Sequence, residues 1–149
     1  MLFRSLRLVA RHAAGWNVVW KATPEWHAER AAALRQAAEE VGRDPSTVRL
    51  SVGLYTLVGE DEADVERRYR ALQAWTPGGA LDGTSLEEFA RDTLTGTVEH
   101  CVERLRAFAE GGVEEFVACA GPVPFSVYDW EAVDLIGERL LPEAHALAA

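Results

Sequence analysis

Cysteine is scarce in this sequence, and long hydrophobic runs are missing from it. The 149 residues include two cysteines, Cys101 and Cys119, which fall in a predicted helix and a predicted strand. Neither has a nearby cysteine or histidine at the spacing of a structural zinc site, so we expect reduced thiols, no bound metal and a cytoplasmic protein. No apolar stretch approaches the roughly 20 residues that cross a bilayer, so we expect no membrane contact.

Positive charge is also in short supply. Lysine and arginine total 15 against 24 aspartate and glutamate residues, which gives a formal net charge of -9. Such a surface repels phosphate backbones and anionic lipids, so nucleic acid is not an expected partner. The start of the chain is the exception, because Arg4, Arg7 and Arg11 precede the first acidic residue, Glu25. This spacing suits an organellar targeting helix, but it also suits a helix lying on a sheet, which we favour.

The motifs of several common enzyme classes are absent as well. The chain has no Gly-x-Gly-x-x-Gly loop, P-loop, His-Glu-x-x-His or Gly-x-Ser-x-Gly sequence. Its histidines all fall on predicted helices, without an evident catalytic partner, and the apolar surroundings of both cysteines are expected to raise their thiol pKa values. We therefore predict no catalytic residue and no metal ligand. The histidines are His12, His27, His100 and His145.

The sequence does have the composition and patterning of one globular domain, with 48% hydrophobic and 26% charged residues. Helical and strand patterns alternate along it. Such alternation predicts parallel strands joined by right-handed crossovers. Strands are expected over residues 15–20, 48–58 and 113–120; helices are expected before the first strand, over 24–41, after residue 60, at the Ser85 capping box, and over 98–110 and 129–147.

About three strands are too few to close a sheet. An eight-stranded (β/α) barrel takes about 250 residues, so this chain is long enough for the last portion of one. The segment RLVARHAAGWNVVW, from Arg7 to Trp20, indicates the end of a helix, a glycine turn and a strand. Because a self-contained α/β protein usually needs no helix before its first strand, we expect this helix to belong to a preceding strand. The predicted fold is α/β, a partial (β/α)8 TIM-type barrel with about three parallel strands and flanking helices.

Three segments carry a resemblance to a known family. They are RLVARHAAGWNVVW, EEVGRDPSTVRLSVGLYTLVGEDE and GTVEHCVERLRAFAEGGVEEFVACAGPVPF. In order and spacing they resemble the C-terminal part of the luciferase-like monooxygenases, which are flavin- or deazaflavin-dependent oxidoreductases built on a (β/α) barrel. The resemblance covers nearly the whole chain from Leu6 onward. It implies that residues 1–149 form a single C-terminal part of such a barrel domain, with the N-terminal strands missing.

Two departures from the family pattern matter. The family commonly has Asp-Gly-Trp-Asn at the strand entry, where this chain has Ala14, Gly15, Trp16 and Asn17, so a contact made by that aspartate is not expected here. The N-terminal part of the barrel, which supplies much of the family's cofactor site, has no counterpart. MLFRS stands where the family usually has a strand ending in glycines. A truncated gene, an internal start and a frameshift remnant are each consistent with this pattern.

Active sites of α/β barrels lie at the carboxyl ends of the strands. If the resemblance holds, Trp20 would wall a planar isoalloxazine ring, and Lys21 would lie near an anionic substrate or phosphate. The alternative roles are a core aromatic residue and an ordinary surface lysine. Gly121 and Pro122 would shape the mouth of the barrel, or simply form a turn. The other residues at these ends are Val58, Gly59, Glu60 and Ala120.

Glu60 and its neighbour Asp61 are the acidic residues nearest a predicted strand end. A carboxylate there is able to act as an acid or base, but capping of the next helix is the role that we favour. Asn17 falls early in its strand, far from the mouth, and is interpreted as structural.

The resemblance implies an oxidoreductase or monooxygenase in which reduced FMN or coenzyme F420 passes a hydride, or with flavin activates oxygen, toward a small organic substrate. The protein's task would be to position the ring and exclude water. A chain with part of the barrel is expected to be inactive alone. The alternative is a non-catalytic α/β module that forms a homo-oligomer or binds a partner through an open sheet edge.

Overall fold

The structure, a computed structural model, describes residues 2–121 and 127–147. In this part of the chain four parallel strands form one sheet: β1 (Gly15–Trp20), β2 (Arg49–Gly59), β3 (Leu94–Thr97) and β4 (Glu115–Cys119). β2 is the central strand. β1 pairs along one side of it, while on β2 the residues 51–55 pair with β4 and the residues 56–59 pair with β3. The parallel direction of all pairs confirms the prediction from the alternating pattern.

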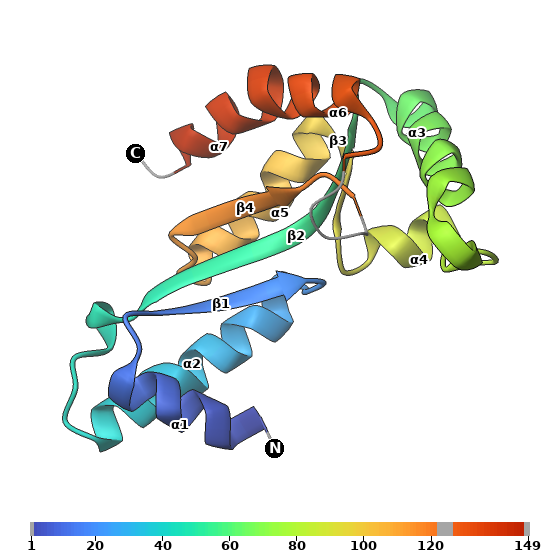
Figure 1. The fold of residues 1–149 in the computed structure, drawn as a ribbon. Helices are drawn as coiled ribbons and strands as arrows, with labels where there is room; N and C mark the ends of the chain where they lie inside the picture. The colour runs from blue at the N-terminus through green and yellow to red at the C-terminus, as the bar shows by residue number, and fades with distance from the viewer. Residues whose placement is uncertain (1, 122–126, 148–149) are drawn as a thin grey trace.

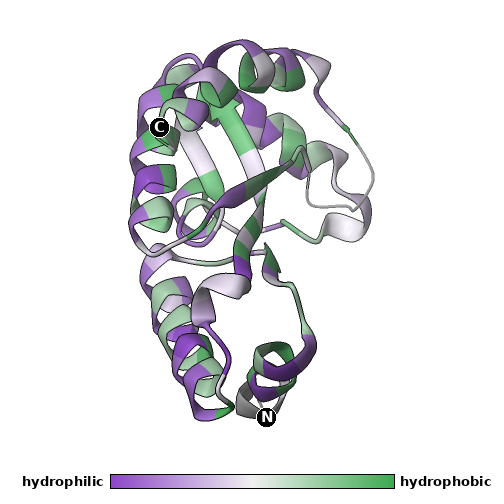
Figure 2. Cartoon of the chain, turned by 90° about the vertical axis from the view of Figure 1, so that its left-hand side faces the viewer, coloured by the Kyte–Doolittle hydropathy of each residue, from purple (hydrophilic) through white to green (hydrophobic). Residues whose placement is uncertain are grey.

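Helices follow each strand, as in a (β/α) barrel. Ser85 and Glu88 form the predicted capping box of α4, and Thr23 caps α2 by accepting a hydrogen bond from the Trp26 N–H. Purple and green segments alternate along the helices in Figure 2, as expected of helices with one buried face. The helices are α1 (Leu2–His12), α2 (Pro24–Glu40), α3 (Glu62–Trp75), α4 (Leu86–Ala90), α5 (Val98–Glu110), α6 (Trp130–Leu135) and α7 (Leu141–Ala146), with 3-10 turns η1 (Pro45–Thr47) and η2 (Pro77–Gly79) and a π-helical turn η3 (Ile136–Leu140) between α6 and α7.

The helices cover one face of the sheet and leave the other face open. Figure 1 shows α5 passing behind β2 and β4, α2 and α1 below β1, and no helix in front of these three strands. Three clusters of buried side chains result. One joins the sheet to α5, α6 and η3, a second joins α1 and α2 to the start of β2, and a third joins α3 and α4 to the end of β2.

The strand β3 is one element that the sequence patterns missed. It is four residues long, and its neighbourhood is polar: the hydroxyls of Thr93 and Thr95 lie 2.8 Å apart and bond to each other. Without apolar alternation, a strand this short leaves no signal beside the stronger cap of α5 at Thr97. The sequence prediction of about three strands therefore becomes four in the described residues.

The end of β2 lies close against the start of α3, and this contact requires a glycine. A Cβ atom on Gly59 would lie 2.6 Å from the backbone nitrogen of Val65, well inside van der Waals contact. At the other end of the sheet, Gly112 follows α5 with a φ of 96°, a conformation that favours glycine. Two glycines, Gly111 and Gly112, thus end this helix.

His27 of α2 is fully buried between two aromatic rings. Its ring centroid lies 5.0 Å from that of Trp16 and 5.9 Å from that of Phe108, and neither ring nitrogen has a hydrogen-bond partner among the described residues. Burial, and to a lesser degree the positive charge of Arg35, lowers the pKa of His27 below its ordinary value of 6.5. The folded protein therefore holds this imidazole neutral.

A neutral buried histidine makes stability depend on pH. Because the pKa of His27 is lower in the folded state, the unfolded chain binds the proton first, and stability falls as the pH drops below 6.5. Between pH 7.5 and 5.5 we expect His27 to account for a loss of up to about 1.4 kcal/mol. Urea unfolding of the wild type and of His27→Phe at both pH values measures it. Equal losses in the two proteins would contradict the assignment.

Candidate functional site

The carboxyl ends of the strands are staggered, so the candidate residues lie at two levels. β1 ends at Trp20, opposite Leu54, and β4 ends at Cys119, opposite Tyr55. β2 and β3 continue beyond this level, to Gly59 and Thr97. Trp20, Lys21 and Gly121 therefore surround the middle of β2, whereas Glu60 lies farther along, where α3 begins.

Trp20 has an unusual backbone conformation. It is the non-glycine residue with a positive φ, 76°, in the described part of the chain, and the Lys21 N–H donates to the Val19 carbonyl across it at 3.0 Å. This is a tight γ-type turn, which is rare and strained. The ring of Trp20 lies 5.4 Å from that of Tyr55. Tyr55 follows the core residue Leu54 on β2 and packs against the side chains of α3 and α4, so the turn places the Trp20 ring beside this cluster.

Lys21 is held by an acidic partner. Its Nζ atom lies 3.4 Å from Oδ1 of Asp92 and 6.0 Å from the ring centroid of Phe89, and its side chain is about half exposed. The Asp92 carbonyl also accepts a hydrogen bond from the Ala22 N–H at 2.7 Å. The segment after β1 is thus tied to the segment before β3, with an ammonium group kept at the rim.

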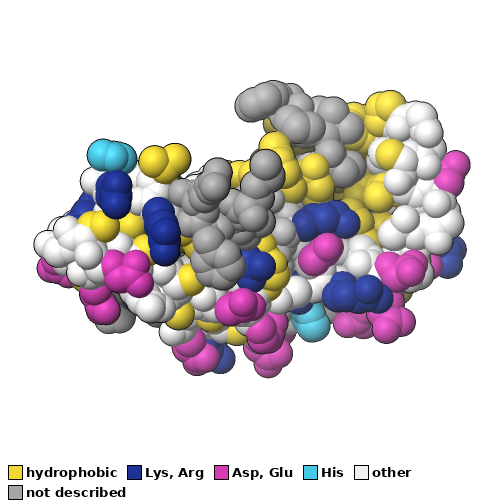
Figure 3. Space-filling model, turned by 90° about the horizontal axis from the view of Figure 1, so that it is seen from below, with side chains coloured by type: hydrophobic (Ala, Val, Ile, Leu, Met, Phe, Trp, Pro, Cys, Tyr) yellow, Lys and Arg dark blue, Asp and Glu magenta, His cyan; other side chains and the backbone are white. Residues whose placement is uncertain are grey.

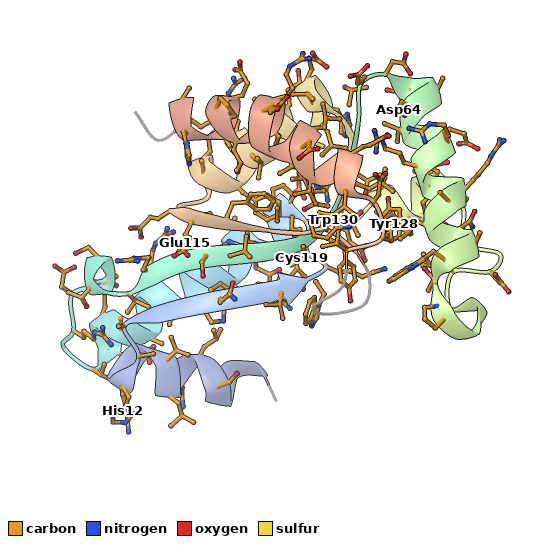
Figure 4. All side chains as sticks on the ribbon, turned by 45° about the horizontal axis from the view of Figure 1, so that its top comes forward. His12, Asp64, Glu115, Cys119, Tyr128 and Trp130 are labelled. Carbon is orange, nitrogen blue, oxygen red and sulfur yellow. The ribbon has the colours of Figure 1, made fainter. Side chains whose placement is uncertain are left out.

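Gly121 and Cys119 form the end of β4. Gly121 is buried, and its N–H donates to the Cys119 carbonyl at 2.8 Å, which turns the chain at once. Pro122, the other residue predicted to shape the mouth, lies outside the described residues. Figure 4 shows Cys119 and Trp130 at the end of β4 opposite Glu115, with Tyr128 on the side of α3.

Tyr55 is the residue of this site that sequence reasoning missed. Burial, and then the neighbouring Cys119, raises its pKa, and burial raises the pKa of the Cys119 thiol. Both groups therefore keep their protons at neutral pH and act as donors rather than bases. The signal was available in RLSVGLY, because Ser51, Gly53 and Tyr55 alternate with the apolar residues that face the helices.

Asp61 caps α3, as the sequence favoured over acid–base chemistry. Its Oδ1 atom accepts a hydrogen bond from the Asp64 N–H at 2.8 Å, while the Glu60 N–H donates to Oδ2 of Asp64 at 3.1 Å. Asp64 in turn accepts from Nε of the buried Arg68 at 2.8 Å, and Arg68 also donates to Asp129. These bonds tie α3 to the start of α6.

The histidines lie on helices, as predicted, in α1, α2, α5 and α7. Cys101 is buried in the core of α5, where burial raises its pKa to about 12. Across residues 2–121 and 127–147, no group of three or more histidine, cysteine, aspartate or glutamate side chains is placed to hold a metal ion. In the same ranges no helix is long and apolar enough to span a bilayer.

Charge and apolar surface are unevenly placed around this site. Figure 3, seen from below, shows magenta acidic side chains along the lower margin and yellow hydrophobic ones gathered toward α3 and α4. The ring of Trp75 in α3 packs against that of Tyr128, with centroids 5.8 Å apart and the planes tilted by 39°. The rim beyond β2 is therefore aromatic and apolar, next to the turn that carries Trp20.

Comparison with known proteins decides the family. The sequence profile described as luciferase-like monooxygenase matches residues 3–115, most of the chain. The chain belongs to the luciferase-like monooxygenase family. This fits the geometry, in which parallel strands present an aromatic rim at their carboxyl ends.

The relatives are much longer than this chain. An F420-dependent hydroxymycolic acid dehydrogenase of Mycobacterium tuberculosis (strain ATCC 25618 / H37Rv) is 28% identical, over 94% of this chain but 40% of its own length. A riboflavin lyase structure with modified FMN and riboflavin matches with a TM-score of 0.71 and 16% identity, over 98% of this chain and 42% of that one. An F420-dependent secondary alcohol dehydrogenase in complex with an F420-acetone adduct matches with a TM-score of 0.68 and 17% identity, over 95% and 46%.

This family member therefore spans less than half the length of these relatives. The structural likeness shows the fold, a partial TIM-type barrel with parallel strands and flanking helices, as the sequence predicted.

Proposed function

We propose that this chain supplies part of the wall of a cofactor site in a luciferase-like oxidoreductase or monooxygenase acting on a small organic substrate, and that it is inactive alone. The observation that carries the proposal is the pair of rings, Trp20 and Tyr55, whose centroids lie 5.4 Å apart at the carboxyl end of β1. Aromatic faces of this kind stack on planar ring systems. Strained backbone such as that of Trp20 clusters at binding sites.

The proposed cofactor is FMN or coenzyme F420, because relatives are named for one or the other. When bound in reduced form, either group supplies hydride transfer, and a flavin also activates oxygen. Trp20 would cover one side of the ring. Lys21, which forms an ion pair with Asp92, would hold an anionic group of the cofactor or substrate. Gly121 and Pro122 would shape the mouth without side-chain hydrogen bonds.

The residues present suit one wall of such a site and no more. Tyr55 and Cys119 keep their protons, so they orient a ligand by donating hydrogen bonds rather than by taking a proton. Exclusion of water from a reduced ring needs walls on the open side as well. Both cysteines are free thiols, in keeping with the cytoplasmic location that we propose.

The monomeric chain is expected to bind neither FMN nor F420 measurably at micromolar concentration, and to show no turnover. A pocket normally covers roughly 70–90% of a ligand of this size, and a chain with four strands leaves most of that surface in water. Fluorescence titration of both cofactors against monomeric protein measures this. Stoichiometric tight binding by the monomer would show that this chain needs no further part of a barrel.

The proposed function itself is tested by repeating the titration at concentrations where the chain associates. Binding of one cofactor is expected there, weakened by Trp20→Ala. Trp26→Ala is the matched control, because Trp26 lies on α2 and contacts Arg30 rather than the strand ends. Absence of binding in every assembly state, or equal losses in the two variants, would refute the assignment of Trp20.

A further inference from the structure

The contact between α2 and α5 is a narrow seam, and His27 lies within it. His27 of α2 is fully buried, and its ring meets that of Phe108 in α5 edge-on at 5.9 Å. Beside this pair, a Cβ atom on Gly111 would lie 3.5 Å from the Cβ atom of Ala28. We name these four residues the α2–α5 seam. The imidazole is the one polar side chain among them.

The seam is also a boundary between two of the buried clusters. The apolar buried residues of α2 belong to the cluster with α1 and the start of β2, whereas those of α5 belong to the cluster with the sheet. Two arginines bridge the boundary: Arg35 of α2 donates to the Gly111 carbonyl at 3.2 Å, and Arg104 of α5 donates to the Ala22 carbonyl at 3.4 Å. Opening at such a boundary costs less free energy than unfolding the whole chain.

The closed seam offers no counter-charge to a protonated imidazole. Burial, and then the positive charge of Arg35, lowers the pKa of His27, and the rings that face it from β1 and α5 are neutral. The carboxylates of Glu25 and Asp92 act on Arg104. The charged form of His27 is therefore stabilised where water reaches the ring, which requires the seam to open.

We propose that His27 is an acid-sensitive switch in the α2–α5 seam: the neutral imidazole lets the seam close, and the protonated one opens it. Opening would release Ala22, whose N–H donates to the Asp92 carbonyl at 2.7 Å and which lies two residues after Trp20. Acid would thereby loosen the turn that carries Trp20 without titrating any group of the candidate site. Because this motion belongs to the fold, it is measurable without a cofactor, so its failure and the failure of the proposed function are separable.

Residue-resolved hydrogen exchange at pH 7.5 and 5.5 measures the opening. The open form takes up a proton near the ordinary pKa of 6.5 and the closed form at a lower pH, so the protection factor of the Ala22 amide should fall by up to about tenfold. This fall should persist at low urea concentrations with little urea dependence, because a local opening exposes little surface. The Leu54 amide in the middle of β2 should exchange only by global unfolding, with a strong urea dependence. Equal protection and equal urea dependence of the two amides would overturn the proposal.

His27→Phe fills the seam with a ring that takes up no proton, and it should abolish the pH response of the Ala22 amide. His100→Gln is the matched control, because His100 lies on α5 but is exposed. Its replacement should leave the response intact. A response that remains in His27→Phe, or one that disappears in His100→Gln, would contradict the assignment to His27.

A disulfide across the seam keeps the test decisive even if His27→Phe does not fold. In the double variant Ala28→Cys, Gly111→Cys, the two Cβ atoms would lie 3.5 Å apart, a distance that disulfides adopt. The oxidised variant should show no pH response of the Ala22 amide, and reduction should restore it. A response that survives the crosslink would show that acid acts elsewhere, and would overturn the proposal.

Discussion

Phe108→Ala is expected to lower the free energy of unfolding by about 3–5 kcal/mol. Phe108 is 1% exposed and belongs, with Cys101 and Leu105, to the buried side of α5 that packs behind the sheet. Its ring meets His27 of α2 edge-on at 5.9 Å, so it joins two helices as well as helix and sheet. Truncation would leave a cavity at this junction that the surrounding side chains fill only in part.

Urea unfolding followed by circular dichroism measures the loss. Arg106→Ala on the same helix is the control, because Arg106 is exposed and its replacement should change stability by no more than about 0.5 kcal/mol. An unchanged midpoint for Phe108→Ala would show that α5 is not docked on the sheet.

The sequence predicts the elements that have strong local signals. β1 falls at residues 15–20 and α5 at 98–110, as expected, because a glycine turn, a threonine cap and a regular apolar stripe mark their ends. The helix over 129–147 is also present, although it contains the π-helical turn Ile136–Leu140 that no local pattern indicates. Capping and periodicity act within a few residues, so they are visible in the chain itself.

Features that depend on neighbouring strands are harder to predict. β2 is covered on both faces near Leu57, where α3 and α4 pack, but not near Gly53. The turn at Trp20 and its contact with Tyr55 join residues 35 positions apart in the numbering. No local pattern reports which strand a residue lies beside, so the aromatic rim emerges only in three dimensions.

The site also depends on how the segment after β4 is anchored. Asp129 caps α6 through a hydrogen bond from the Ala132 N–H, and it receives a second bond from Arg68 of α3. Arg68 thereby holds the residue next to Tyr128, whose ring packs at a tilt against Trp75 and whose pKa is raised to about 12 chiefly by burial. The position of the apolar rim at the candidate site therefore depends on the hydrogen bonds of one buried side chain, Arg68.

Arg68→Met is expected to lower the free energy of unfolding by about 3 kcal/mol. The side chain is 6% exposed and lies between the carboxylates of Asp64 and Asp129, so its removal leaves two negative charges, each on a side chain that is 16% exposed, without their shared cation. Arg67→Met is the matched control. Arg67 also bonds to Asp64, at 2.6 Å, but it is 59% exposed, and its loss should cost less than about 1 kcal/mol.

The pH dependence of the stability difference between the wild type and Arg68→Met identifies the cause of that difference. Burial alone would raise the pKa of Asp64, but hydrogen bonds from Arg68, the Glu60 N–H and Arg67 outweigh it and lower the pKa to about 2. A lowered carboxyl pKa contributes stability above the ordinary value of 3.8 that is lost as the pH falls toward 2. The gap between wild type and Arg68→Met should therefore be full at pH 6 and shrink below pH 4. Unfolding at a series of pH values measures it, and a gap that stays constant down to pH 2.5 would mean that packing of the arginine stem, rather than its charge, holds α3 to α6.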